Sequence, residues 1–303
     1  MIDEFKYVVN NSKYVHININ KLNEFINELD VNSYKYWLDD FNLNLDEKKL
    51  ILLVCIIESM NFCFWKKPKW KIEYHNEIYS GSNALFYSVI KEVENNNKFL
   101  NIDYLYNLDF NEFSKIFEGI EVCPYLDKRY SNFKEVVNYI KNNDFYNELY
   151  SIKSDRELID YITNRFKCFD DKSIYKDKVI HFNKRATLLV NDLYNVSNTI
   201  KNNIGNIDSL SGCADYAIPR ILRDYGVLEY SEELSNLIDK EIEISHDSEM
   251  EIEIRANMLY VIELIREKLN NKINSVELDS IVWNMSRNYN RKSVSHHTVT
   301  IYY

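Results

Sequence analysis

The pattern of apolar and polar positions along the chain predicts a protein built mainly of helices. Residues 46–60 begin with acids and then become apolar on every side, which is typical of a helix buried at the centre of a fold. Apolar residues recur at helical spacing in residues 178–194 and again in residues 248–269. Residues 154–166 predict a further helix, because a serine at the N-cap is followed three residues later by glutamate, the capping-box pattern.

A strand pattern is confined to one short stretch. Residues 70–81 alternate between apolar and polar side chains on either side of His75-Asn76, which predicts a small β-hairpin. We expect short amphipathic helices before Leu45 and two or three helices in residues 101–143. Further short helices are predicted to begin at Ser209, Ala217 and Ser231.

These patterns predict one all-α domain with one small β-hairpin, spanning residues 1–303 and arranged as two helical lobes. The chain has five Gly and three Pro, and it shows no internal repeat and no linker-like segment. So few turn residues favour helices with short connections over a β-sandwich or barrel. The C-terminal VTIYY is apolar, and we expect it to pack against the protein.

Charge and cysteine content favour a cytoplasmic protein that binds a small molecule. The formal net charge is −10, and Lys and Arg are interleaved with acids, so there is no basic stripe to hold nucleic acid. The longest apolar run, residues 50–57, is too short to span a bilayer. The five cysteines form no CxxC pair, which is typical of reduced packing residues. We therefore expect no nucleic-acid partner and no membrane.

Charged side chains are concentrated in residues 181–226, among Leu, Ile, Val and Tyr. They are Lys184, Arg185, Asp192, Asp208, Asp215 and Arg220. Because an unpaired charge is costly to bury, such residues need either mutual partners or a ligand. This segment is therefore the first place to look for a binding site.

Asp215 is the most informative acid in this segment. It follows a stretch of small residues and precedes a predicted helix with Pro219 in its first turn, where the helix dipole favours an ionised carboxyl group. An ordinary N-cap aspartate would show the same pattern. In the same way, Lys184 could be a solvated surface lysine and Asp208 could cap a nearby helix.

Two charges occupy the apolar side of the helix predicted for residues 248–269. Glu251 and Arg255 are four residues apart, so they can pair with each other. The pair could be a structural ion pair in the core, or it could border a polar pocket. The opposite, polar side is expected to carry Glu249, Glu253, Asn257, Tyr260 and Glu267.

Metal-binding and nucleotide-binding motifs are weak or missing. His296-His297, and His246 with Glu249, lack a third ligand at a suitable spacing, so we expect no metal site. No P-loop, dinucleotide-binding or serine-hydrolase motif occurs. The aromatic stretch NFCFW at residues 61–65 is typical of core packing, and it could also stack against a flat ring.

Taken together, these stretches resemble the queuosine salvage protein family, the queuosine 5′-phosphate N-glycosylases. The matching stretches are NFCFW (61–65), residues 70–85, FNKRATLLVNDLY (182–194), IDSLSGCADYAIPRILRDYGVLEYS (207–231), EMEIEIRANMLYVIE (249–263) and HHTVTIYY (296–303). The resemblance implies a helical fold similar to that of helix-hairpin-helix DNA glycosylases. It also implies hydrolysis of queuosine 5′-monophosphate to queuine and ribose 5-phosphate, with no metal or organic cofactor. Two motifs depart from the family pattern, because ADYAIPR replaces ADYRVPQ and HHTV replaces HRTR.

The resemblance also assigns roles to individual residues. Asp215 is expected to be the catalytic carboxylate, with Asp208 as the second candidate. A carboxylate beside the anomeric carbon would stabilise an oxocarbenium-like transition state and orient or deprotonate the attacking water. The expected substrate-binding residues are the aromatic Phe62, Phe64, Trp65 and Tyr216, the phosphate-binding Lys184, Arg220 and His297, and the pocket-organising Glu251 and Arg255.

Three other functions remain as alternatives. A DNA glycosylase or another nucleic-acid-binding helical protein is opposed by the net acidity of the chain. A non-catalytic protein that sequesters a nucleotide or a base would bind the ligand without turnover. A helical scaffold would bind no ligand at all.

Overall fold

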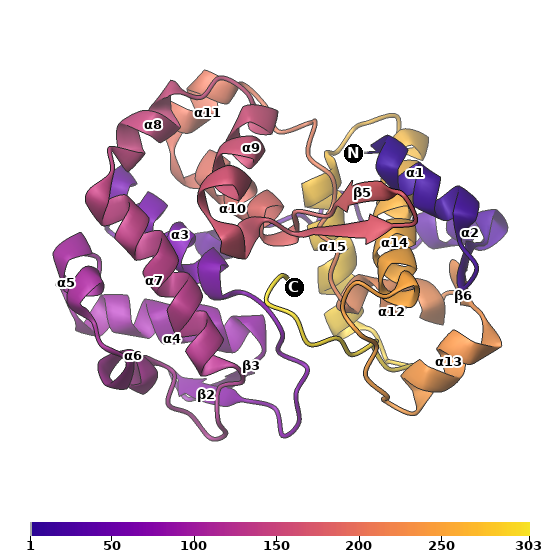
Figure 1. The fold of residues 1–303 in the computed structure, drawn as a ribbon, viewed down its shortest axis with the longest axis horizontal. Helices are drawn as coiled ribbons and strands as arrows, with labels where there is room; N and C mark the ends of the chain where they lie inside the picture. Colours follow the sequence, from indigo (N-terminus) through magenta and orange to yellow (C-terminus); the bar gives the residue numbers. More distant parts are fainter. Residues whose placement is uncertain (1) are drawn as a thin grey trace.

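The computed structural model describes residues 2–303, and these residues are mainly helical (Figure 1). The α-helices are α1 (Ile2–Asn11), α2 (Ile19–Ile26), α3 (Glu47–Met60), α4 (Ser82–Asn95), α5 (Ile102–Asn107), α6 (Phe110–Ile116), α7 (Leu126–Asn142), α8 (Phe145–Ser151), α9 (Asp155–Arg165), α10 (Lys184–Val196), α11 (Asn198–Ile204), α12 (Ala217–Asp224), α13 (Glu232–Asp239), α14 (Glu249–Lys268) and α15 (Ser275–Asn288). Two short 3₁₀ helices are η1 (Trp37–Asp40) and η2 (Lys167–Phe169). The prediction of a mostly helical protein is confirmed.

The described residues also contain three antiparallel pairs of short strands. The strands are β1 (Val15–Ile17), β2 (Lys71–Tyr74), β3 (Glu77–Ser80), β4 (Lys172–Tyr175), β5 (Lys178–His181) and β6 (Leu228–Tyr230). The β2–β3 hairpin is the predicted one, with Tyr74 opposite Glu77. The β4–β5 hairpin and the β1–β6 pair were not predicted, so the expectation of a single hairpin was wrong.

The prediction that a helix begins near Lys178 was also wrong. Residues 178–181 form β5, and α10 begins only at Lys184. The side chains of β4 alternate between exposed and buried, which is a strand pattern. The carbonyl oxygen of Asp171 accepts hydrogen bonds from the backbone N–H groups of Phe182 and Asn183, so the chain is fixed in a turn before the helix starts.

Helix starts were predicted well where a side chain caps them. Asp46 accepts a hydrogen bond from Lys49 N at the start of α3, and Ser154 accepts one from Glu157 N at the start of α9. The helix expected at Ser209 does not form. Its backbone N–H and its hydroxyl both donate to the buried Asp155 carboxylate, at 3.0 and 2.7 Å, so Ser209 is not available as a cap.

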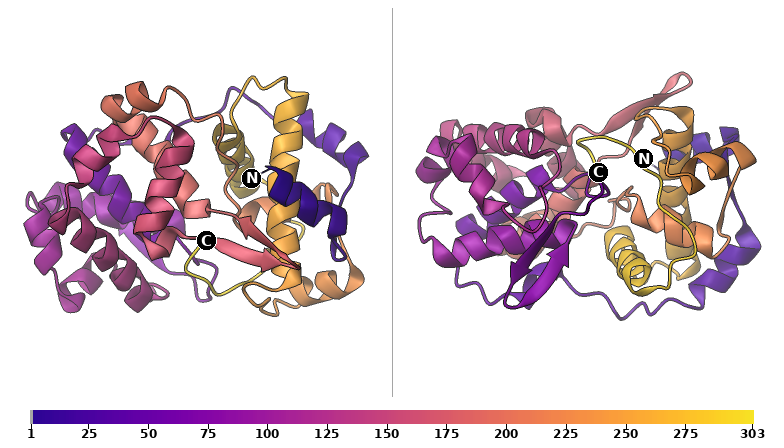
Figure 2. Two further views of the ribbon diagram at one scale, coloured as in Figure 1. Left: turned by 45° about the horizontal axis from the view of Figure 1, so that its top comes forward. Right: turned by 90° about the horizontal axis from the view of Figure 1, so that it is seen from below.

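The buried apolar side chains form two clusters. The first surrounds α3, which packs against α7 and α10. The second surrounds α14, which packs against α1, α12 and α15. The two groups of helices lie on opposite sides in Figure 1, and the chain ends between them in every view (Figures 1 and 2). Tyr303 is buried there, and its carbonyl oxygen accepts a hydrogen bond from Cys63 N at 2.8 Å, so the C-terminal segment is docked as predicted.

One face of α14 differs from the sequence prediction. Glu253 and Asn257 were expected on an exposed polar side, but both are fully buried. The Glu253 carboxylate accepts hydrogen bonds from the backbone N–H groups of Lys13 and Tyr14 and from the Tyr175 hydroxyl. The segment after α1 therefore covers this face, and the polar side chains are retained because backbone donors satisfy them.

The cysteines follow the prediction. All five are free and buried, and each packs within the apolar interior. Among the helices of residues 2–303, none combines the length and the apolar character needed to cross a membrane.

Candidate functional site

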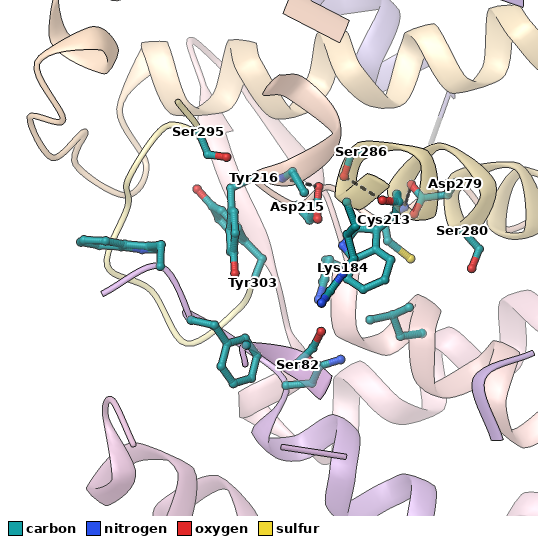
Figure 3. Close-up of a pocket in the computed structure, with 18 of the residues that line it drawn as sticks. Ser82, Lys184, Cys213, Asp215, Tyr216, Asp279, Ser280, Ser286, Ser295 and Tyr303 are labelled. Atoms are coloured by element: carbon teal, nitrogen blue, oxygen red, sulfur yellow. Dashed lines mark hydrogen bonds between the residues drawn. The ribbon is translucent and has the colours of Figure 1, made fainter. Parts of the chain in front are cut away.

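A pocket of about 400 Å³ lies where η1, the loop after α3, α10, α12, α15 and the C-terminal segment come together (Figure 3). This volume is suitable for a small-molecule ligand. The predicted site residues that line it are Phe62, Phe64, Trp65, Lys184, Asp215, Tyr216, Arg220 and His297. Asp208, Glu251 and Arg255 do not line it. Asp208 is exposed, so the structure does not support its choice as second catalytic candidate.

Asp215 is held rigidly at the start of α12. Its Oδ1 accepts hydrogen bonds from Ala217 N and Ile218 N, both at 2.9 Å, which are two of the free N–H groups of the first helical turn. The carboxyl group is buried, and burial raises its pKa, although these backbone bonds and the charge of Lys184 oppose the shift. This arrangement leaves Oδ2 for the pocket, since it takes part in no hydrogen bond within residues 2–303.

A second carboxyl group, Asp279 of α15, lies close to Asp215 (Figure 3). Its Oδ1 accepts a hydrogen bond from Cys213 N at 2.8 Å. Burial raises the pKa of Asp279 well above its usual value, and the charge of Asp215 raises it further. Gly212 lets the Asp279 carboxyl group lie against the backbone at Cys213, because a Cβ at residue 212 would lie 2.8 Å from Asp279 Oδ1.

Lys184 is the cation beside these two acids. It is the first residue of α10, and its backbone N–H donates to Asp171 Oδ2 at 3.2 Å. The side chain is buried, so the alternative of a solvated surface lysine was wrong. Its charge opposes the upward shift that burial causes in the pKa of Asp215 and of Asp279. Its amine makes no salt bridge within the described residues.

The aromatic stretch after α3 is fixed by two buried arginines. Arg185 donates to the carbonyl oxygens of Glu58 and Ser59, at 2.8 and 2.5 Å. Arg129 donates to the carbonyl oxygen of Phe62 at 2.7 Å, and both guanidinium groups lie over the Phe62 ring. Cationic groups are favourable at a helix C-terminus, where the last carbonyl groups lack helical partners. Arg129 and Arg185 therefore hold the loop after α3 against the pocket.

Trp65 and His297 form one aromatic wall of the pocket. Their rings stack with centroids 4.3 Å apart and an interplanar angle of 8°. Trp65 Nε1 donates to the carbonyl oxygen of Thr298 at 2.9 Å, which ties the loop to the C-terminal segment. Burial lowers the pKa of His297, so its ring is neutral near pH 7 and suited to stacking.

Basic side chains gather along another part of the pocket. This basic cluster consists of Lys67, Lys69, Arg220, Arg287 and Arg291. Lys67 pairs with Glu241 and Arg220 with Asp224, whereas the other three make no salt bridge within residues 2–303. Burial and the positive charges around it lower the pKa of Lys69. Cations that repel one another in this way form a site for an anion such as phosphate.

Glu251 and Arg255 form the predicted ion pair, and it lies in the core. Arg255 Nη1 is 3.4 Å from Glu251 Oε1, and Nη2 is 2.6 Å from Asp171 Oδ2, all three side chains being buried. The guanidinium also lies 4.0 Å from the ring centroid of Phe182 and 4.2 Å from that of Tyr303. Because Asp171 also binds the N–H of Lys184, the pair supports the pocket from behind instead of bordering it.

One group with metal-ligand spacing occurs in the described residues. It consists of His246, Asp247 and Glu251, and it lies outside the pocket. Glu251 Oε1 already faces Arg255, which competes with any cation. The His296-His297 pair does not belong to this group.

Comparisons with known proteins place this arrangement in a family. The family model described as queuosine salvage protein matches residues 41–303. The chain belongs to the queuosine salvage protein family.

Curated relatives share most of their length with this queuosine salvage family member. A protein of Sphaerobacter thermophilus is 28% identical over 278 residues, covering 88% of this chain and 85% of the relative. One of Dictyostelium discoideum is 29% identical, covering 96% and 95%, and one of Bos taurus is 26% identical, covering 91% and 88%. Each of the three is named queuosine 5′-phosphate N-glycosylase/hydrolase.

Several pocket residues of this family member were missed by sequence reasoning. They are Tyr36, Trp37, Glu58, Asp192, Asp279, Lys67, Lys69, Arg287 and Arg291. Asp192 was noted as a charge in an apolar stretch but was given no role. One sequence signal could have identified Asp279. It falls among the apolar residues on the buried side of α15, where an acid is unusual.

Proposed function

We propose that this protein hydrolyses the N-glycosidic bond of queuosine 5′-monophosphate and releases queuine and ribose 5-phosphate. The names of its relatives support this substrate and this bond. The observation that carries the proposal is the position of Asp215, a carboxylate fixed by two backbone N–H groups beside Lys184 and Asp279 in a ligand-sized pocket. Such a constellation suits the cleavage of a bond to an anomeric carbon.

In the proposed reaction, Asp215 stabilises positive charge that develops on the ribose and orients or deprotonates water. The two acids have different roles. The pKa of Asp279 is raised well above its usual value, so Asp279 is the one that stays protonated. A protonated carboxyl group can donate a hydrogen bond to substrate or water while its ionised neighbour accepts one. Asp279 thus takes the second place that Asp208 held in the sequence prediction.

The leaving group of queuosine is a 7-deazapurine, which has no ring nitrogen at position 7 to protonate. Departure is therefore assisted by hydrogen bonds to other edges of the base and by aromatic packing. The Trp65–His297 stack and the buried Phe64, which also lines the pocket, are suited to hold a flat ring. Tyr216 adds a hydroxyl group beside Asp215, and Phe62 supports this wall from within.

The basic cluster is the proposed site of the 5′-phosphate. We expect the double variant Lys69→Ala, Arg291→Ala to lower the ratio of kcat/KM for the monophosphate to that for the nucleoside by roughly 10- to 100-fold, the effect of losing charged hydrogen bonds. The measurement is steady-state kinetics on both substrates at low and high salt. The matched control is Lys66→Ala, which removes an exposed lysine of the same loop that does not line the pocket.

The reaction itself is tested by incubating the purified protein with queuosine 5′-monophosphate, with and without EDTA. Free queuine measured by chromatography is the expected product, and chelation should leave its rate unchanged. If no queuine appears, the proposal of hydrolysis is wrong, and a thermal shift with the same compound then separates a binding protein from a scaffold.

We also propose the setting in which the protein acts. The two buried clusters are taken as two lobes of one domain covering residues 1–303, with the pocket between them. A catalytic carboxylate at a helix start supports kinship with helix-hairpin-helix DNA glycosylases. The five free cysteines support action in the cytoplasm. The net charge of −10 supports a small-molecule substrate without nucleic acid. No cofactor is needed for the proposed chemistry.

A further inference from the structure

Two buried acids line the pocket without making a salt bridge within residues 2–303. Glu58, at the end of α3, is 1% exposed, and Asp192 of α10 is 2% exposed. The ion pairs that are buried on both sides in residues 2–303 are made by Arg220 and Arg255, and none includes these two acids. The neighbouring Arg185 is already engaged with carbonyl oxygens. Unpaired buried carboxyl groups are costly, so a ligand that supplies their partner is the simplest reason to retain them.

The hydrogen bonds of these acids are also incomplete. Asp192 Oδ1 accepts a bond from Trp37 Nε1 at 3.0 Å. The hydroxyl group of Tyr36 lies near Asp192 and lowers the pKa of its carboxyl group, but neither that hydroxyl nor Asp192 Oδ2 has a partner at hydrogen-bond distance. Glu58 accepts from Asn61 Nδ2 alone, at 3.1 and 3.2 Å. All of these residues line the pocket. The free positions are therefore acceptors on the acids and a hydroxyl that can donate or accept.

Burial acts on both acids, and the charge of Glu58 acts on Asp192. Burial raises the pKa of Glu58 to about 7, and burial together with the charge of Glu58 raises that of Asp192 well above its usual value. A bound cation would lower both pKa values and remove the repulsion. The stacked rings of Trp37 and Phe86, with centroids 4.5 Å apart, add an apolar surface beside this group.

The charges are ordered along the pocket. Lys184 acts on both Glu58 and Asp215, and Arg220 of the basic cluster acts on Asp215. Asp215 thus shares one neighbouring cation, Arg220, with the basic cluster and another, Lys184, with Glu58. If phosphate binds the basic cluster and the ribose lies at Asp215, the base extends toward Glu58 and Asp192.

We propose that Tyr36, Trp37, Glu58 and Asp192 form an acidic subsite that selects substrates whose base carries an arm with a protonated amine and hydroxyl groups. The ring substituent of queuosine, a secondary amine joined to a cyclopentene diol, has this chemistry. The inference rests on the proposed function, because it places the ribose at Asp215. It makes the two acids the determinants of base specificity, while Asp215 and Asp279 act on the bond.

The test compares two substrates that share the ring and the phosphate. Queuosine 5′-monophosphate carries the arm, and 7-deazaguanosine 5′-monophosphate lacks it. We expect Asp192→Asn and Glu58→Gln each to lower the ratio of kcat/KM for the armed substrate to that for the armless one by roughly 10- to 100-fold, as for loss of a charged hydrogen bond. The matched control Asp155→Asn alters a buried acid outside the pocket and should leave the ratio unchanged.

A ratio that stays within about twofold of wild type in both variants overturns the inference, whether or not overall activity falls. Circular dichroism and thermal melting check that each variant folds. Calorimetric binding of free queuine and 7-deazaguanine provides a measurement that needs no turnover. If the wild type cleaves neither nucleotide, the proposed function fails, but tighter binding of queuine that is lost in Asp192→Asn still supports the subsite. Equal binding of the two bases to wild type overturns it.

Discussion

Replacing Asp215 by Asn is expected to lower kcat by roughly 10²–10⁴-fold while leaving substrate affinity within a few-fold of wild type. The amide oxygen can still accept the hydrogen bonds from Ala217 N and Ile218 N, so the start of α12 keeps its cap. What is lost is the negative charge opposite the developing oxocarbenium ion and the capacity to take a proton from water. The measurement is queuine release under saturating queuosine 5′-monophosphate, with affinity obtained separately by calorimetry.

The stability of this variant provides a control with a defined sign. Burial raises the folded-state pKa of Asp215 above its unfolded value, so folding favours the protonated form. The ionised carboxylate therefore destabilises the fold, and this cost develops as pH rises through the unfolded-state pKa. An uncharged amide avoids the cost, so the melting temperature at neutral pH should equal or exceed that of wild type. A large loss of activity without loss of stability identifies Asp215 as functional.

Asp208→Asn is the matched comparison for Asp215→Asn. Asp208 is exposed and outside the pocket, so its replacement should change neither activity nor stability appreciably. If Asp208→Asn abolished turnover and Asp215→Asn did not, the assignment of the catalytic carboxylate would be reversed. A pH profile provides a further measurement. In wild type and in Asp208→Asn, activity should decrease on the acidic side as Asp215 becomes protonated, at a pH above the ordinary range of aspartate.

The parts of the site that could be predicted are those fixed by local sequence. Asp215 lies just before the N-cap residue of α12, and its hydrogen bonds to Ala217 N and Ile218 N depend only on the residues that follow it. Glu251 and Arg255 are one helical turn apart, so their pairing follows from helical spacing once that side is known to be buried. The central helix α3 is apolar all round, which leaves burial as its only stable environment.

The parts that could not be predicted depend on contacts between distant segments. Glu253 appeared to lie on a polar face until the segment after α1 supplied backbone donors from more than two hundred residues away. The basic cluster combines the loop after α3 with α12, α15 and the segment that follows α15, and no one of these stretches carries more than two of its charges. Asp192 illustrates the same limit, because the lack of a hydrogen-bond partner for its Oδ2 is a property of the folded pocket.

The β4–β5 hairpin shows how one such contact displaced a prediction that was locally sound. The apolar residues of 178–194 do recur at helical spacing, but residues 178–181 pair with β4 as the strand β5. Asp171 ends the hairpin through its carbonyl oxygen and starts α10 through its carboxylate, which binds Lys184 N. The position of Lys184 in the pocket therefore depends on a side chain that precedes the hairpin, and Asp171 in turn depends on Arg255.

Replacing Arg255 by Met is expected to cost about 3–5 kcal/mol of unfolding free energy, because it leaves the buried carboxylates of Asp171 and Glu251 without their cation. Methionine fills much of the same volume, so the loss reflects charge and hydrogen bonding more than a cavity. The rings of Phe182 and Tyr303 lose a cation–π partner in the same change. Urea denaturation at neutral pH measures the effect.

The matched control is Arg223→Met, which breaks the salt bridge to Asp239 at the surface and should cost less than about 1 kcal/mol. A cost for Arg255→Met as small as this would show that the buried network contributes little to the fold. Because Asp171 also binds Lys184 N, the Arg255 variant should lower kcat even at temperatures where it is fully folded. A folded Arg255→Met protein with wild-type kcat would mean that Lys184 is positioned without this network, and that the ion pair serves stability alone.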